Sequence, residues 1–206
     1  MLLGTNVDNY DVKPQDTEPE SIGLQATLTI KVVDKNGNVK SKFTVKSHSP
    51  TYNFIALLEY IVGKTVTITA IDGTQINTHG LYQFFVCSVA IAVGSGTSSS
   101  PFNQTNLVAT IPNGNGAGQL VYGSTNVSNS ITGSGNALSF EIYNVFTNAS
   151  NTTVSVSELG LIVNVQFVLN DTYEPYNVLV WYDTIPTINL APGDALTVTY
   201  TFTINP

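Results

Sequence analysis

The chain of 206 residues contains no arginine and a single cysteine, and charged residues make up only 10% of it. A typical soluble domain carries about 25% charged residues. With only Cys87, neither an internal disulfide framework nor a cysteine-based zinc site can form. No apolar run approaches the roughly 20 residues of a transmembrane helix, so we expect no membrane span. The opening Met-Leu-Leu-Gly is too short and too uncharged to predict a signal peptide.

Positive charge is confined to the first third of the chain. All the lysines lie between Lys13 and Lys64, and only acidic charges follow apart from His79. Nucleic-acid backbones are bound chiefly by Lys and Arg, so we expect no nucleic-acid partner. Five lysines cluster on a predicted hairpin, and they form either a solvated face or a contact with an acidic surface such as another copy of the chain: Lys31, Lys35, Lys40, Lys42 and Lys46.

Neutral hydroxyl and amide side chains take the place of ions, because Ser, Thr, Asn and Gly dominate the polar composition. This composition is typical of secreted, cell-surface and virion proteins and is unusual for cytosolic enzymes. Five Asn-X-Ser/Thr sequons are possible glycosylation sites in an extracellular setting: Asn103, Asn126, Asn148, Asn151 and Asn170.

The sequence divides into an arm and one domain. Residues 1–23 contain two prolines, five acidic residues and little apolar content. Proline and like-charge repulsion favour an extended segment, which is either a disordered tail or an arm that becomes ordered on a neighbouring subunit. Residues 24–206 predict a β-sandwich domain.

The domain shows β periodicity with one helical stretch. Lys35-Asn36-Gly37-Asn38 predicts a hairpin turn. Ser49 and Pro50 are suited to begin a short helix near residues 50–62. Leu81–Val93 is a long, mostly apolar run and predicts a central strand that buries Cys87. The other expected strands are Leu24–Asp34, Val39–Ser47, Lys64–Ile71, Leu138–Phe146, Val154–Val168, with a bulge at Gly160, Asn177–Asp183 and Ala195–Ile204.

The number of strands and the long glycine-rich connections indicate an all-β fold, an antiparallel β-sandwich or jelly roll. Parallel βαβ units would need repeated helices, and only one helix is predicted.

Few residues suggest catalysis. Neither His48 nor His79 has a nucleophile motif beside it. Glu141 and Glu158 could form a glycosidase pair, but each is equally a structural carboxylate. We therefore expect no catalytic residue, no cofactor and no metal site. Four late aromatic residues could stack on a glycan or contact a partner, although core packing is the simpler interpretation: Tyr173, Tyr176, Trp181 and Tyr182.

Three short motifs occur in a characteristic order: Gly94-Ser95-Gly96-Thr97, Glu158-Leu159-Gly160-Leu161 and Pro192-Gly193-Asp194-Ala195-Leu196. With the hairpin and the Ser-Pro-Thr-Tyr-Asn-Phe helix start, this order resembles viral structural proteins. These include phage tail and fibre proteins and the jelly-roll vertex or turret proteins of archaeal icosahedral viruses such as Sulfolobus turreted icosahedral virus. The resemblance implies a virion component and carries over no catalytic residues.

The expected function is therefore that of a non-enzymatic virion structural protein. Such a protein would form a homo-oligomer, for instance a pentamer, and would contact other coat proteins. The alternatives are a surface adhesin that binds a host receptor or glycan, a glycosidase acting through Glu141 or Glu158, and a pilus-like subunit whose arm completes a neighbour's sheet.

Overall fold

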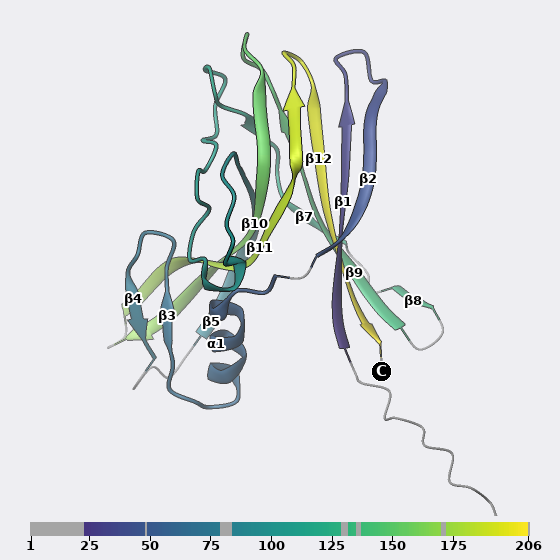
Figure 1. Cartoon of the computed structure of the whole chain (residues 1–206). Helices are drawn as coiled ribbons and strands as arrows, with labels where there is room; N and C mark the ends of the chain where they lie inside the picture. Colours follow the sequence, from purple (N-terminus) through teal and green to yellow (C-terminus); the bar gives the residue numbers. More distant parts are fainter. Residues whose placement is uncertain are drawn as a thin grey trace, which may run out of the picture.

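Two main antiparallel sheets, a separate two-stranded hairpin and one α-helix make up most of the described part of the chain (Figure 1). The computed structural model describes residues 23–47, 49–78, 84–128, 132–134, 137–169 and 172–205. The predicted arm therefore lies outside the described residues, apart from Gly23. Among the described residues, no helix combines the length and the apolar character that crossing a bilayer requires.

The larger sheet has the strand order β2-β1-β12-β9, and the short strands β6, β7 and β8 pair with the far side of β9. Its strands are β1 (Gly23–Val33), β2 (Val39–Ser47), β6 (Val121–Tyr122), β7 (Asn126–Val127), β8 (Thr132–Ser134), β9 (Ala137–Thr147) and β12 (Ala195–Asn205).

The smaller sheet has the order β11-β10-β5. A separate hairpin, β3–β4, and α1 lie beside this sheet at one end of the molecule (Figure 1). These elements are α1 (Tyr52–Ile61), β3 (Thr67–Thr69), β4 (Gln75–Asn77), β5 (Phe84–Gly94), a short 3₁₀ turn η1 (Pro101–Asn103), β10 (Val154–Leu169) and β11 (Thr172–Leu190).

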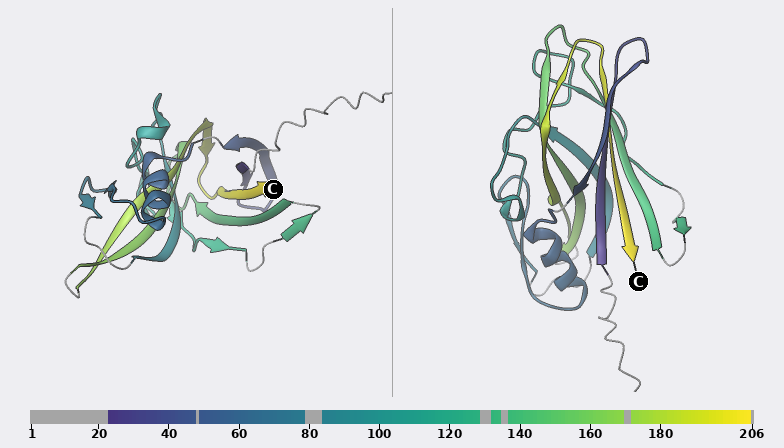
Figure 2. Two further views of the ribbon diagram at one scale, coloured as in Figure 1. Left: turned by 90° about the horizontal axis from the view of Figure 1, so that it is seen from below. Right: turned by 45° about the vertical axis from the view of Figure 1, so that its right-hand side comes forward.

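The alternation of β12 shows why the sheets face each other. Leu196, Val198, Tyr200 and Phe202 are buried, while the threonines between them are only partly covered. Successive side chains of a strand point to opposite faces, so one face of the larger sheet supplies half of the core. The sheets lie close at one end and diverge toward the end that carries α1 and the C-terminus (Figure 2).

The predicted all-β antiparallel sandwich with one short helix is confirmed. Its described residues form seven long strands: β1, β2, β5, β9, β10, β11 and β12. A jelly roll has eight strands in two Greek keys. The prediction is therefore confirmed as a β-sandwich and not as a jelly roll.

The prediction for Leu81–Val93 was wrong about position. β5 is an edge strand, not a central one, and its side chains from Val86 to Ala90 are largely exposed. Cys87 is exposed instead of buried. A continuous apolar run is typical of a strand covered on both faces, but it does not show whether those faces are covered by the same chain.

Two local predictions also needed correction. The helix is capped by Thr51, whose side chain makes no capping hydrogen bond, and Pro50 instead forms a β-bridge with Trp181. Gly160 is not a bulge, because it pairs regularly with neighbours on both sides. A Cβ there would lie 2.7 Å from Leu179 Cδ1, so close packing explains the glycine.

Candidate functional site

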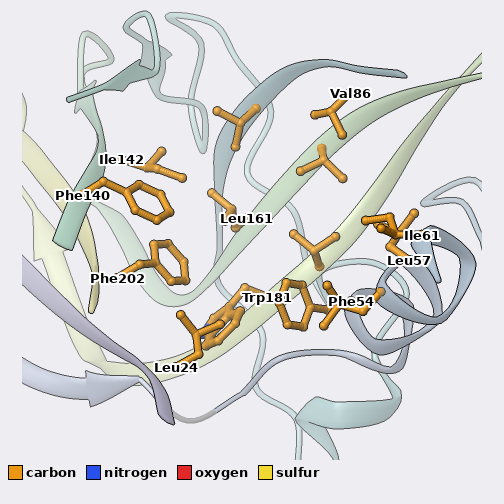
Figure 3. A pocket seen from close by; sticks show the side chains of 14 residues that line it. Leu24, Phe54, Leu57, Ile61, Val86, Phe140, Ile142, Leu161, Trp181 and Phe202 are labelled. Carbon is orange, nitrogen blue, oxygen red and sulfur yellow. The ribbon is translucent and has the colours of Figure 1, made fainter. Parts of the chain in front are cut away.

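An apolar cleft opens where the two sheets diverge. Its volume is about 400 Å³, and every residue that lines it is apolar. Leu24, Phe140 and Phe202 form the wall contributed by the larger sheet, as Figure 3 shows. A packed protein interior contains few voids larger than a water molecule, so the described part of the chain leaves this apolar surface uncovered.

The opposite wall comes from the smaller sheet and from α1. Val86 and Leu161 lie on β5 and β10, and Leu57 and Ile61 lie on α1 (Figure 3). The helix is held there by Asn53, which is buried and exchanges hydrogen bonds with the backbone of Thr69 on β3. The hydrogen bonds between Asn53 and Thr69 therefore fix the position of the part of the wall that α1 contributes.

Trp181 forms the floor of the cleft. Its ring meets Phe54 and Phe202 edge-on, with centroids 5.6 Å and 5.2 Å away. Its indole N–H donates to the Ser47 hydroxyl, which donates in turn to the carboxylate of Asp183. The apolar ring of Trp181 thus lines the cleft, while its N–H is hydrogen-bonded in the core.

Tyr200 completes this buried polar network. Its hydroxyl donates to Asp183 Oδ2 over 3.0 Å. Burial, and secondarily the charge of Asp183, raises the pKa of Tyr200 well above its usual value. The phenol therefore remains a donor throughout the neutral pH range, and the network fixes the geometry of the cleft floor.

Exposed apolar side chains lie at the mouth of the cleft on α1 and β5, and Val62 directly follows α1. The exposed fractions are 46% for Leu58, 64% for Ile61, 74% for Val62 and 57% for Val86. We call these four residues the rim. Single exposed apolar residues are ordinary, whereas a contiguous set beside an apolar hollow marks an interaction surface.

The free edge of β5 borders the same cleft. The second half of β5 is covered by the loop after it, because Ile111 N–H donates to Val93 O and Gly94 bridges Thr110. Within the described residues, the first half pairs only with β10. Cys87 lies in this half, at a shift of register, and is exposed. An uncovered edge of this kind can pair with an additional strand.

Glu158 organises the loop that covers the other half of β5. The carboxylate is fully buried and accepts backbone N–H bonds from Gly96, Val108 and Ala109 at 2.7–2.9 Å. Tyr182 donates its hydroxyl to the same group over 2.9 Å. Burial and this hydrogen bond raise the pKa of Tyr182 to about 12. Both carboxylate oxygens of Glu158 therefore accept hydrogen bonds that hold the loop against β10 and β11.

Two of the three sequence motifs meet at this point. A Cβ on Gly96 would lie 2.8 Å from Glu158 Oε1, and Gly94 is still more crowded by the same carboxylate. The glycines of the first motif thus make room for the glutamate of the second. Sequence spacing could not reveal this contact, because 62 positions separate the two partners.

Glu141 and Glu158, the alternative glycosidase pair, have different surroundings. Glu141 is exposed on β9 in the larger sheet, where Thr201 donates to it, whereas Glu158 is buried in the smaller sheet. His48 and His79 lie outside the described residues. Among the described residues, no three His, Cys, Asp or Glu side chains lie together in a group that could hold a metal ion.

The four aromatic residues do not share one surface. Tyr173 is 58% exposed, and Tyr176 is half-buried against Phe167. Trp181 and Tyr182 are buried, in keeping with core packing, the simpler interpretation of these residues. Alternation along β11 does not explain the difference, because every residue of Val178–Tyr182 is buried and both faces of the strand are therefore covered there.

The sequons differ in accessibility. Asn103, Asn126 and Asn151 are exposed, and Asn170 lies outside the described residues. Asn148 is fully buried. Its side-chain nitrogen donates to Thr152 O and Leu190 O over 2.8 Å each. A glycan on that nitrogen is incompatible with this fold, so Asn148 is not a glycosylation site of the folded protein.

Replacing Asn148 by alanine should lower the free energy of unfolding by about 2 kcal/mol, because the buried carbonyl of Leu190 and the part-buried carbonyl of Thr152 lose their donor. Asn151→Ala is a matched control, since it removes the neighbouring sequon at an exposed position, and it should change stability by less than about 0.5 kcal/mol. Urea unfolding of protein made without glycosylation measures both. Equal midpoints for the two variants would contradict the structural role of Asn148.

The lysine cluster is partly paired. Lys40 forms an ion pair with the buried Asp194, which also accepts the N–H of Ala191. Lys31 and Lys42 lie directly opposite each other on β1 and β2. Like charges placed opposite each other are destabilising, so this outer face retains positive charge for a solvated or acidic environment.

Comparisons with known proteins add no assignment. No family model, curated protein or solved structure matches the chain.

Proposed function

We propose that this chain is a non-enzymatic structural subunit of a virion that assembles with copies of itself. The observation that carries the proposal is the apolar cleft with its exposed rim, which is built for covering by another protein surface. Symmetric self-association is the usual form of such assemblies. Contacts with other coat proteins and with a host receptor or glycan belong to the same proposal.

The character of the remaining surface supports this role. Charged residues are scarce, and neutral hydroxyls and amides replace them. Burying ions between subunits carries a large desolvation cost, which a neutral polar surface avoids. The order of motifs shared with turret and fibre proteins supports a position at a vertex or appendage, for which a pentamer is the expected form.

The test is the oligomeric state of the full chain. Sedimentation velocity over a range of concentrations should show a discrete oligomer, and Ile61→Asp should shift it toward monomer by placing a charge on the rim. Val39→Asp is the matched control, because Val39 is 56% exposed on β2 and is not a rim residue. A monomer at every concentration would contradict self-assembly. Electron microscopy of the assembly or of virus particles then gives its symmetry and location.

A further inference from the structure

The cleft and the free edge of β5 form one composite feature. Val86 and Val89 belong to the half of β5 that has no second partner among the described residues, and both line the cleft. A strand placed along this edge would extend the smaller sheet with backbone hydrogen bonds. Its alternate side chains would enter the cleft. Strand addition of this kind combines an open edge with pockets for every second side chain.

The sequence of the chain contains a segment with the required pattern. Residues 2–8 read Leu-Leu-Gly-Thr-Asn-Val-Asp and contain no proline. As a strand, this segment would place Leu3, Thr5 and Val7 on one face. The other face would carry Gly4, Asn6 and Asp8, after the initial Leu2. One face therefore suits an apolar cleft and the other suits solvent.

The chain enters the described domain beside the cleft. β1 begins at Gly23, and Leu24 itself lines the cleft. Residues 9–22 form a linker that can span at most about 46 Å. Two copies that bring their clefts together could therefore exchange these segments, as in domain swapping.

The linker favours exchange over return to the chain's own cleft. Pro14 and Pro19 stiffen it, and Asp16, Glu18 and Glu20 repel one another, so it resists a tight reversal. Lys46 lies in a hollow that shares Leu24, Phe54 and Trp181 with the cleft. This exposed cation complements an acidic linker that arrives from another copy.

We infer that the cleft and the free edge of β5 bind residues 2–8 of a second copy of this chain as an added strand. The inference rests on the proposed self-assembly and names the segment that produces it. The linker of each copy crosses between the two domains.

Cys87 provides a direct test, because it is the only cysteine and is exposed on the free half of β5. It is not among the residues that line the cleft, so it should neighbour the solvent face of an added strand. Gly4→Cys, Asn6→Cys and Asp8→Cys are oxidised one at a time in the full chain. Thr5→Cys and Val7→Cys serve as controls on the opposite face, and Asp16→Cys reports random collision.

We expect disulfide-linked dimers to form about tenfold faster at one or more of positions 4, 6 and 8 than at 5, 7 or 16, because only side chains on the same face are neighbours across strands. Mixing Asn6→Cys on a Cys87→Ser background with the unmodified chain should give a mixed dimer. Dimers at the background rate at every position would overturn the inference, as would a disulfide within one monomer.

Sedimentation separates this inference from the proposed function. If the full chain forms an oligomer but no position links to Cys87 above background, self-assembly stands and the arm inference is wrong. If the chain is monomeric throughout, both are wrong. Val7→Asp should shift the oligomer toward monomer, whereas Asn6→Asp, on the other face, should leave it unchanged. Equal behaviour of these two variants also contradicts the inference.

Discussion

Replacing Glu158 by leucine should lower the free energy of unfolding by about 4 kcal/mol, because one buried hydroxyl and three part-buried N–H groups lose their acceptor. Three backbone N–H groups and the hydroxyl of Tyr182 converge on this carboxylate. The side chain is fully buried, so water cannot replace it without opening the loop. Chemical denaturation measures the loss, and increased proteolysis after Gly96 would show that the loop has been released.

Glu158→Gln separates the effect of shape from that of the acceptors. The amide oxygen can still accept from Gly96 and Ala109, but the amide nitrogen would face the N–H of Val108. We expect a loss of about 2 kcal/mol. Glu141→Gln is the matched control at an exposed position, and it should change stability by less than about 0.5 kcal/mol. If Glu158→Leu is as stable as the control, Glu158 does not hold the loop.

Replacing Trp181 by alanine should also cost about 4 kcal/mol, since it removes a large buried side chain and leaves a cavity. The ring is 3% exposed and contacts Phe54 and Phe202. Its loss would deepen the cleft and remove the donor to Ser47. The measurement is the urea midpoint, together with the loss of the near-ultraviolet signal of the neighbouring aromatic rings.

Two variants serve as controls for Trp181. Trp181→Phe keeps most of the packing but loses the indole N–H, so we expect about 1–2 kcal/mol. Tyr173→Ala lies on the same strand at an exposed position and should cost less than about 0.5 kcal/mol. A large effect at Tyr173 with little effect at Trp181 would reverse the assignment of core and surface on β11.

The boundaries of the strands were predictable wherever a local pattern determined them. β12 alternates apolar and threonine side chains along most of its length, and both ends agree with the prediction to within a residue. β11 is much longer than the predicted Asn177–Asp183 and contains Pro175 and Pro186. Proline is tolerated there because β11 is an edge strand, and edge position is not visible in a single segment.

The site was less predictable, because it depends on contacts between distant segments. The parity of Glu158 indicated burial, and the structure shows it fully buried. Its partners come from a loop about 50–62 positions earlier in the chain. The apolar run around Cys87 indicated a buried strand, yet the first half of that strand has only one pairing partner among the described residues. An apolar sequence indicates that a surface is buried, but it does not show whether the same chain or another molecule buries it.

By itself, the sequence determined the all-β class, the position of the helix and the scarcity of charge, since each follows from composition or from a period of two or 3.6 residues. Tertiary structure alone decided that the sheets diverge, that Trp181 floors an open apolar cleft and that β5 ends its sheet. Those features arise from pairings across most of the chain, where no local periodicity records which strands become neighbours.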